Sequence, residues 1–324
     1  MKRRVFAALL GSAALNGPIA LAQVASRVPR IAVLDWESPG TERVAPLRRG
    51  LRELGYVEGE SIHVEYRFAE GRAERAAALA EEIVRSGVDV IVALTTPAAR
   101  AVQRATSTIA IVVASADPVG AGLVTNLSRP GGNLTGASTM MTDLESKRME
   151  LLREVLPGAR RLAYLGSAPD PATPNFLREA QEAAARIGAH VEPALVDNPG
   201  EIDAALTRLA GRRVEAVIVQ PLFTLTTIAS GRVAELAARH GLPAIASFAH
   251  FPRSGGLLSF GPSTEFGAHA AAKYVDRILK GAKPGDLPIE QPATFELVLN
   301  LKTAKALGIP IPQVVLLRAD ELIE

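Results

Sequence analysis

The sequence of 324 residues contains no cysteine. This absence excludes disulfide bonds, cysteine-ligated zinc, iron–sulfur clusters and catalysis by a thiol. It also excludes a bacterial lipoprotein anchor, which needs a lipidated cysteine at the cleavage site. Aromatic residues make up only 4% of the chain, and no stretch after residue 22 is long and apolar enough to cross a membrane. The remaining composition is typical of a soluble globular protein, and the length favours two domains.

The motifs of common enzyme classes are also missing. The sequence has no P-loop, no H-E-x-x-H and no G-x-S-x-G segment. Gly120 and Gly122 begin like a dinucleotide-binding fingerprint, but Thr125 occupies the position of the third glycine. The five histidines are scattered, without the spacing of metal ligands. We therefore expect no catalysis, no cofactor and no bound metal.

The first 22 residues have the features of an export signal. A basic start, "MKRR", precedes the apolar stretch "VFAALLGSAAL", which is too short to span a bilayer. Ala20 and Ala22 are the small residues expected before a cut at Gln23. Lys2, Arg3 and Arg4 contribute +3 to a formal net charge of +2, so the mature chain carries about −1. We expect a periplasmic monomer, cleaved near Ala22, that does not bind nucleic acid.

From residue 30 onward, apolar segments typical of strands alternate with segments typical of helices. This alternation predicts parallel sheets with helices on both faces. The pattern breaks at "RPGGNLTGAS", residues 129–138, restarts, and breaks again at "GGLLSFGPS", residues 255–263. We interpret this as two doubly wound α/β lobes, with crossings near residues 133–138, 256–263 and 294–300. The predicted lobes are residues 23–136 with 263–294, and residues 137–262 with 295–324.

One strand-to-helix turn, in "VDVIVALTTPAARAVQRAT" (residues 88–106), has the features of an anion site. The pattern predicts Thr96 as the N-cap and Pro97 as the first helical residue. A helix N-terminus with nearby hydroxyl groups suits a carboxylate. We expect Thr95, Thr96 and the backbone N–H of Ala98 to bind one. The alternative is a capped turn without a ligand.

Other strand ends carry polar or aromatic residues as well. Asp117, before Pro118, suits a ligand ammonium group, or else it caps the turn that follows. Trp36 and Phe248 either stack on a ligand or belong to the core. Because parallel sheets bind ligands outside the carboxyl ends of their strands, these ends predict a polar cleft between the lobes. The candidate ligand-binding residues are Trp36, Thr95, Thr96, Ala98, Asp117, Ser167, Gln220 and Phe248.

Several stretches, in order, carry a family resemblance: "LRRGLRELGYVEGESIHVEYRFAEG", "VDVIVALTTPAARAVQRATSTIAIVVASADPVGAGLV", "SRPGGNLTGAST", "ELAARHGLPAIASF", "SGGLLSFGPS" and "FELVLNLKTAKALGI". The chain resembles the periplasmic substrate-binding proteins of ABC transporters, in the branch associated with tryptophan and tyrosine uptake. The resemblance implies the type I periplasmic binding protein fold. It also implies that a small polar solute, an amino acid or similar zwitterion, is delivered to an ABC permease in the inner membrane.

By the same resemblance, "TTPA" at residues 95–98 matches a turn that faces the ligand carboxylate, and "DP" at 117–118 matches a loop of the cleft. Ser167, Gln220 and Phe248 lie where the second lobe contributes to the site. The loop "DWESPG" after the first strand differs from the "SP" loops of many relatives, which leaves the identity of the ligand open.

Two other classes of function stay open at this point. An exported α/β enzyme would need a nucleophile, base or metal set, which the sequence does not show. A ligand-sensing repressor on the same two-lobed fold would need a DNA-binding segment of roughly sixty residues before the sensor. Here the first predicted strand begins near Arg30, behind the export signal.

Overall fold

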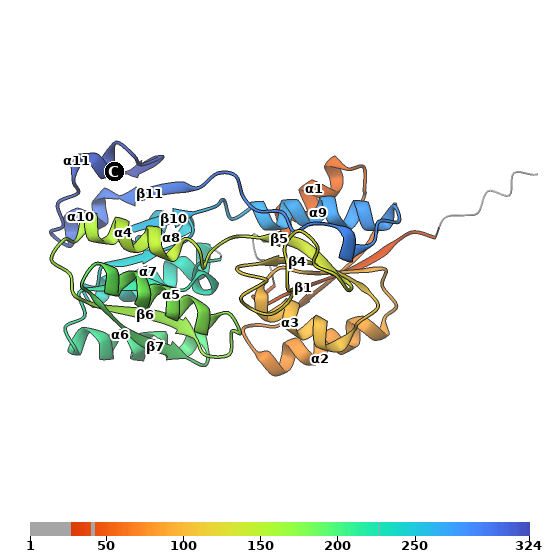
Figure 1. Cartoon of the computed structure of the whole chain (residues 1–324), viewed down its shortest axis with the longest axis horizontal. Helices are drawn as coiled ribbons and strands as arrows, with labels where there is room; N and C mark the ends of the chain where they lie inside the picture. Colours follow the sequence, from red (N-terminus) through yellow and green to blue (C-terminus); the bar gives the residue numbers. More distant parts are fainter. Residues whose placement is uncertain (1–26, 40–42, 226) are drawn as a thin grey trace, which may run out of the picture.

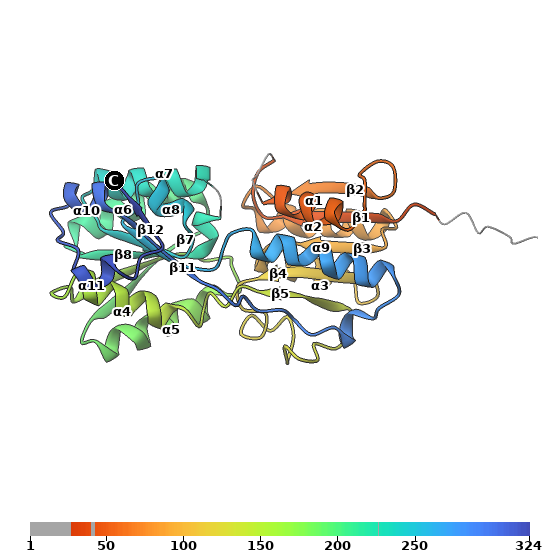
Figure 2. The same ribbon diagram turned by 90° about the horizontal axis from the view of Figure 1, so that it is seen from above.

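The computed structural model describes residues 27–39, 43–225 and 227–324, so the predicted export signal lies outside the described residues. The chain forms two α/β lobes that lie side by side along the long axis of the molecule (Figure 1). Each lobe is a sheet with helices on both faces, as Figure 2 shows from a second direction. This architecture confirms the predicted two-lobed α/β fold.

The first lobe contains a five-stranded parallel sheet in the order β2-β1-β3-β4-β5. Its strands are β1 (Arg30–Asp35), β2 (His63–Phe68), β3 (Val90–Ala93), β4 (Ala110–Ser115) and β5 (Leu134–Ser138). Its helices are α1 (Val44–Glu53), α2 (Ala73–Arg85), α3 (Thr96–Ala105), α9 (Phe266–Leu279) and the 3₁₀ turn η3 (Pro284–Asp286).

The second lobe contains a seven-stranded sheet in the order β12-β11-β10-β9-β8-β6-β7. Its strands are β6 (Arg161–Ser167), β7 (His190–Val196), β8 (Ala216–Val219), β9 (Ala244–Ala246), β10 (Leu258–Gly261), β11 (Glu296–Asn300) and β12 (Glu321–Ile323). Its α-helices are α4 (Glu145–Val155), α5 (Thr173–Arg186), α6 (Ile202–Gly211), α7 (Thr227–Arg239), α8 (His250–Arg253), α10 (Leu301–Ala306) and α11 (Gln313–Leu316). Two 3₁₀ turns complete it, η1 (Pro199–Glu201) and η2 (Pro221–Thr224).

Alternation along the buried strands explains the layers of the first lobe. Ile31 and Val33 pack on one face of β1, under α1 and α9, whereas Ala32 and Leu34 pack on the other face, under α2 and α3. Successive side chains of a strand point to opposite faces of its sheet, so a continuous apolar run such as "IAVL" fills both layers. The second lobe is parallel except that β11 runs antiparallel to β10.

The first two crossings between the lobes lie later in the chain than the sequence predicted, and the third lies earlier. Residues 134–138 form β5, which pairs with β4 from Ile111 to Ser115 and completes the first sheet. Gly136 is required there, because a Cβ atom at this position would lie 2.1 Å from the carbonyl oxygen of Val113. Similarly, residues 258–261 and 296–300 are paired strands of the second sheet. The chain therefore crosses at residues 139–144, 262–265 and 291–295.

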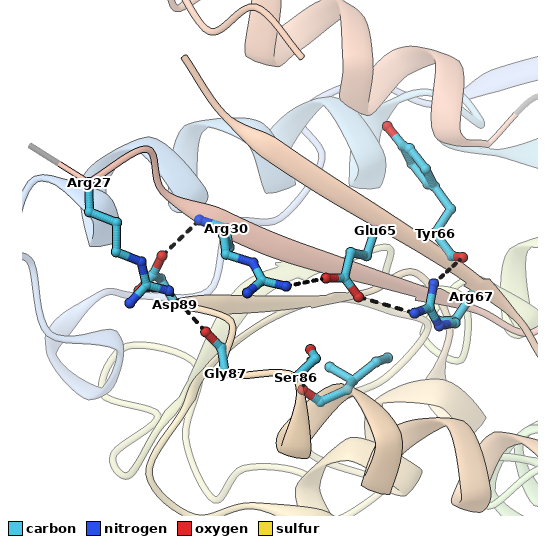
Figure 3. Close-up of polar contacts among 9 residues, drawn as sticks. Arg27, Arg30, Glu65, Tyr66, Arg67, Ser86, Gly87 and Asp89 are labelled. Carbon is cyan, nitrogen blue, oxygen red and sulfur yellow. Dashed lines mark hydrogen bonds and ion pairs between the residues drawn. The ribbon is translucent and has the colours of Figure 1, made fainter. Parts of the chain in front are cut away.

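The exposed edge of the first sheet is lined with charge (Figure 3). Glu65 on β2 accepts a hydrogen bond from Arg30 on β1 at 2.7 Å and a second from Arg67 at 3.1 Å. Asp89 accepts a hydrogen bond from the backbone N–H of Arg30, which fastens the amino ends of β1 and β3 together. A charged edge strand resists pairing with a second chain, so this cluster protects the edge of the sheet.

Candidate functional site

The strand order of both lobes places a ligand site between them. In each sheet the first strand of the lobe lies between the second and the third, which creates a switch point beside β1 and β3 and another beside β6 and β8. Open α/β sheets bind ligands outside the carboxyl ends of the strands at such points. The residues after these four strands line two adjoining cavities, and both cavities have walls from both lobes.

The inner cavity lies next to the crossings and encloses about 50 Å³. Thr95 and Thr96 line it from the first lobe, Asp170 and Phe248 line it from the second, and Thr139 lines it from the first crossing. The outer cavity encloses about 270 Å³. Its walls include Trp36, Glu37 and Ser167 together with apolar side chains of η2, α6 and α7. Leu222 lines both cavities, so the two are neighbouring chambers of one cleft.

The turn into α3 has a different cap from the one predicted. Thr95, not Thr96, is the N-cap: its backbone is extended and its hydroxyl accepts a hydrogen bond from the N–H of Ala98 at 3.3 Å. Thr96 is the first helical residue, and Pro97 follows in the second position. Proline fits either of the first two positions, because neither donates within the helix, so the sequence could not fix the register.

The hydroxyl of Thr96 connects two strand ends of the first lobe. It lies 3.0 Å from the hydroxyl of Ser115 at the end of β4 and accepts a hydrogen bond from the N–H of Ala116 at 3.4 Å. The predicted donors of the α3 turn are therefore partly engaged within the protein, including the N–H of Ala98. A ligand carboxylate at this turn would share these groups with the cap.

The loop after β1 contributes a buried ion pair and an acidic side chain. Asp35 is fully buried, and its Oδ2 lies 3.4 Å from Nε of Arg43, which lines the inner cavity. Arg43 also donates a hydrogen bond to the carbonyl oxygen of Leu94. Burial, and to a lesser degree the charge of Asp35, raises the pKa of Glu37 to about 7, although Arg43 acts in the opposite direction.

Trp36, on the same loop, is 4% exposed and is both a core residue and a wall of the outer cavity. Phe248 is equally buried and lines the inner cavity while packing in the core of the second lobe. Each of these aromatic residues therefore packs in the core and also lines the cleft, and stacking on a ligand stays a prediction.

A buried polar network closes the second-lobe side. Gln220, fully buried, accepts a hydrogen bond from the N–H of Ser167 at 2.6 Å and another from the hydroxyl of Thr173 at 3.1 Å. Its amide nitrogen donates to Oδ2 of Asp170 at 2.7 Å, and the N–H of Ala172 donates to Oδ1 of Asp170 at 2.9 Å. Ser167 reaches the outer cavity, whereas Gln220 stands behind Asp170.

Asp170 is a cavity residue that the sequence reasoning missed. It is 4% exposed, and burial raises its pKa to about 6 despite the hydrogen bond from Ala172. Its signal in the sequence is an Asp-Pro dipeptide three residues after a strand, the same dipeptide that drew attention to Asp117.

Asp117 lies next to the inner cavity but not on its wall, since the preceding residue, Ala116, lines that cavity. It is half-buried, and its Oδ1 accepts a hydrogen bond from the N–H of Gly120 at 2.7 Å, as a turn cap would. It is absent from the walls of the two chambers described above. The structure thus brings Trp36, Thr95, Thr96, Ser167 and Phe248 to the cleft, keeps Ala98 and Gln220 behind its surface, and leaves Asp117 outside.

Two further features, a membrane-spanning helix and a metal-binding cluster, are absent from the described residues. No helix of residues 27–39, 43–225 or 227–324 is both long and apolar enough to cross a membrane. The same part of the chain holds no cluster of three or more histidine, cysteine, aspartate or glutamate side chains that could coordinate a metal ion.

Known proteins resemble this chain over most of its length. A "Tyrosine-binding protein" of Clostridioides difficile is 27% identical over 260 residues, which cover 80% of this chain and 74% of the relative. The crystal structure of an ABC domain in complex with L-Trp from Streptococcus pneumoniae is 30% identical, with a TM-score of 0.81, and covers 92% of this chain and 100% of that one. A conserved domain protein from Vibrio cholerae is 27% identical, with a TM-score of 0.83, and covers 91% of this chain and 100% of that one.

The family comparison covers the two lobes together. The family model described as "ABC transporter substrate binding protein" matches residues 31–323, from the first strand of the first sheet to the last strand of the second. The matched region contains both chambers of the cleft and all three crossings. The chain therefore belongs to the family of ABC transporter substrate-binding proteins.

Proposed function

We propose that this substrate-binding protein is exported to the periplasm and binds an amino acid between its two lobes, for delivery to an ABC permease of the inner membrane. The observation that carries the proposal is the two-chambered cleft at the opposed switch points of the two sheets. Two relatives support the choice of ligand, since one is named a tyrosine-binding protein and another was solved with L-Trp. The protein acts without catalysis and as a monomer.

The outer chamber suits the side chain of an aromatic amino acid. Its apolar walls come from Trp36 on the first lobe and from a larger set on the second, namely Ile202, Leu222, Phe223 and Val233. Burial of an aromatic ring against such walls is worth several kcal/mol, at about 25 cal/mol per Å² of apolar area. The inner chamber, with its hydroxyl groups and charges, receives the polar end of the ligand.

The individual contacts are proposals on the same footing. Thr95, Thr96 and the N–H of Ala98 bind the ligand carboxylate; Ser167 and Phe248 contact the ligand from the second lobe; Gln220 acts through the residues it holds in place. The sequence suggested Asp117 for the ligand ammonium group; its Oδ1 accepts a hydrogen bond from the N–H of Gly120, and it is absent from the walls of both chambers.

Native mass spectrometry of the protein, purified from the periplasm without refolding, tests this function. We expect a co-purified small molecule whose mass matches an amino acid, and a mature chain that begins at Gln23. Calorimetric titration with L-tryptophan and L-tyrosine then measures affinity, where a micromolar dissociation constant corresponds to about −8 kcal/mol. Recovery of a chemically altered ligand would instead favour an exported enzyme, and a chain that retains Met1 would contradict export by cleavage.

A further inference from the structure

Asp170 is a buried carboxylate at the wall of the inner chamber. It is 4% exposed, and no cationic side chain of the described residues forms an ion pair with it. Ionised groups removed from water are normally paired with an opposite charge, because burial of an isolated charge is costly. The position of Asp170 therefore calls for a cationic partner, and no ion pair among the described residues provides one.

Among the described residues, neutral donors hold this carboxylate in place. The N–H of Ala172 and the amide of Gln220 each donate one hydrogen bond, and Gln220 is fixed in turn by Ser167 and Thr173. A carboxylate has about four acceptor positions, so two remain for a donor on the cavity side. The orientation is set before a ligand arrives, which reduces the entropic cost of binding.

The opposite wall of the same chamber carries the complementary charge. Arg43 on the first lobe lines the chamber, and its Nε has no hydrogen-bond partner among the described residues, although Oδ2 of Asp35 lies 3.4 Å away. The first lobe thus presents a guanidinium group beside Thr95, and the second lobe presents a carboxylate. A ligand that carries both charges can satisfy both walls at once.

We propose that Asp170 binds the ammonium group of the ligand, with the ligand carboxylate directed toward Arg43 and the α3 turn. This assignment rests on the proposed function and specifies its substrate class: a primary amine with a carboxylate, a zwitterion that bridges the lobes. Asp117, whose Oδ1 is engaged by the N–H of Gly120 outside both chambers, is then a turn cap. A bridging zwitterion also gives each lobe its own charged contact, so closure of the lobes depends on both ends of the ligand.

Two matched variants separate the assignments. Asp170→Asn and Asp117→Asn each alter an aspartate that precedes a proline and accepts a backbone hydrogen bond, which asparagine can still accept. Calorimetric titration uses L-tryptophan and indole-3-propionate, which lacks only the amine. Asp170→Asn should weaken the binding of L-tryptophan by about thirtyfold or more, which is the lower end of the effect expected when one partner of a buried charge pair is removed. The affinity for indole-3-propionate should stay the same or increase. Asp117→Asn should leave both affinities unchanged.

The outcomes distinguish this inference from the function on which it rests. If Asp117→Asn loses affinity for L-tryptophan while Asp170→Asn binds it as tightly as the wild type, the assignment of Asp170 is overturned and the proposed amino-acid binding is not. Failure of the wild-type protein to bind any amino acid would overturn both. If Asp170→Asn does not fold, the wild-type protein decides: L-tryptophan should bind far more tightly than indole-3-propionate at pH 8, and equal affinities would refute an ammonium site.

Discussion

The raised pKa of Asp170 predicts how the stability of the ligand-free protein depends on pH. Burial raises this pKa from 3.8 to about 6. The shift is about 2 pKa units, which at 1.36 kcal/mol per unit corresponds to about 3 kcal/mol. Because the folded pKa lies above the unfolded one, the protonated form favours the native state. The destabilising effect of the charge is absent below about pH 4, grows between pH 4 and 6, and is complete above pH 6.

Replacement of Asp170 by asparagine isolates this contribution. Urea unfolding of the wild type and of Asp170→Asn, both without ligand, should be measured from pH 4 to pH 8. The unfolding free energy of the variant minus that of the wild type should increase by about 3 kcal/mol between pH 4 and pH 7. Other charges near the chamber, including Arg43 with Asp35 and the Glu145–Arg148 pair, are common to both proteins and cancel in the difference.

A second carboxyl group provides the control for the pH window. The pKa of Glu37, in the outer chamber, is raised to about 7. The unfolding free energy of Glu37→Gln minus that of the wild type should therefore continue to change up to pH 7. A difference for Asp170→Asn that stays flat from pH 4 to pH 8, or that moves in favour of the wild type, would refute the reasoning from burial.

Four further predictions test other parts of the structure. Thr96→Val removes the hydroxyl that joins α3 to Ser115, and calorimetry should show affinity for L-tryptophan reduced by about 1 kcal/mol; unchanged affinity would remove this turn from the site. Trp36 is the only tryptophan, so its fluorescence should change when L-tyrosine binds, and an unchanged spectrum at saturation would place the ligand elsewhere. Arg148→Met leaves the buried carboxylate of Glu145 unpaired and should lower the unfolding free energy by about 3–5 kcal/mol in urea, whereas a loss below 1 kcal/mol would contradict a buried pair. Small-angle scattering should show a smaller radius of gyration with saturating ligand, and an unchanged radius would count against closure about the three crossings.

The sequence predicted the fold more fully than it predicted the site. Continuous apolar strands alternating with amphipathic helices identify two parallel α/β lobes, because each such strand needs cover on both faces. The glycine and flanking turn residues of β5 are typical of a loop, so the sequence predicts a crossing there. Gly136 is in fact a strand residue that lets the backbone of Val113 approach closely, which only the folded sheet reveals. The short elements α11 and β12 have too few residues for a periodic pattern.

The differences at the site between the sequence-based expectation and the structure have a different physical origin. Asp117 and Asp170 each precede a proline after a strand, so local sequence treats them alike. They differ because Gln220, which lies fifty residues further along the chain and directly after β8, donates a hydrogen bond to Asp170 at the cavity wall. The N-cap of α3 is one residue earlier than predicted because proline is compatible with both registers. Which polar groups face a ligand is thus decided by contacts between elements, which local patterns do not encode.

The structure of the mature protein crystallised with L-tryptophan tests the central claim most directly. We expect one ligand between the lobes, with its indole ring in the outer chamber beside Trp36 and its ammonium nitrogen within hydrogen-bond distance of Asp170. A ligand bound outside the cleft, or an empty cleft in crystals grown at saturating L-tryptophan, would contradict it.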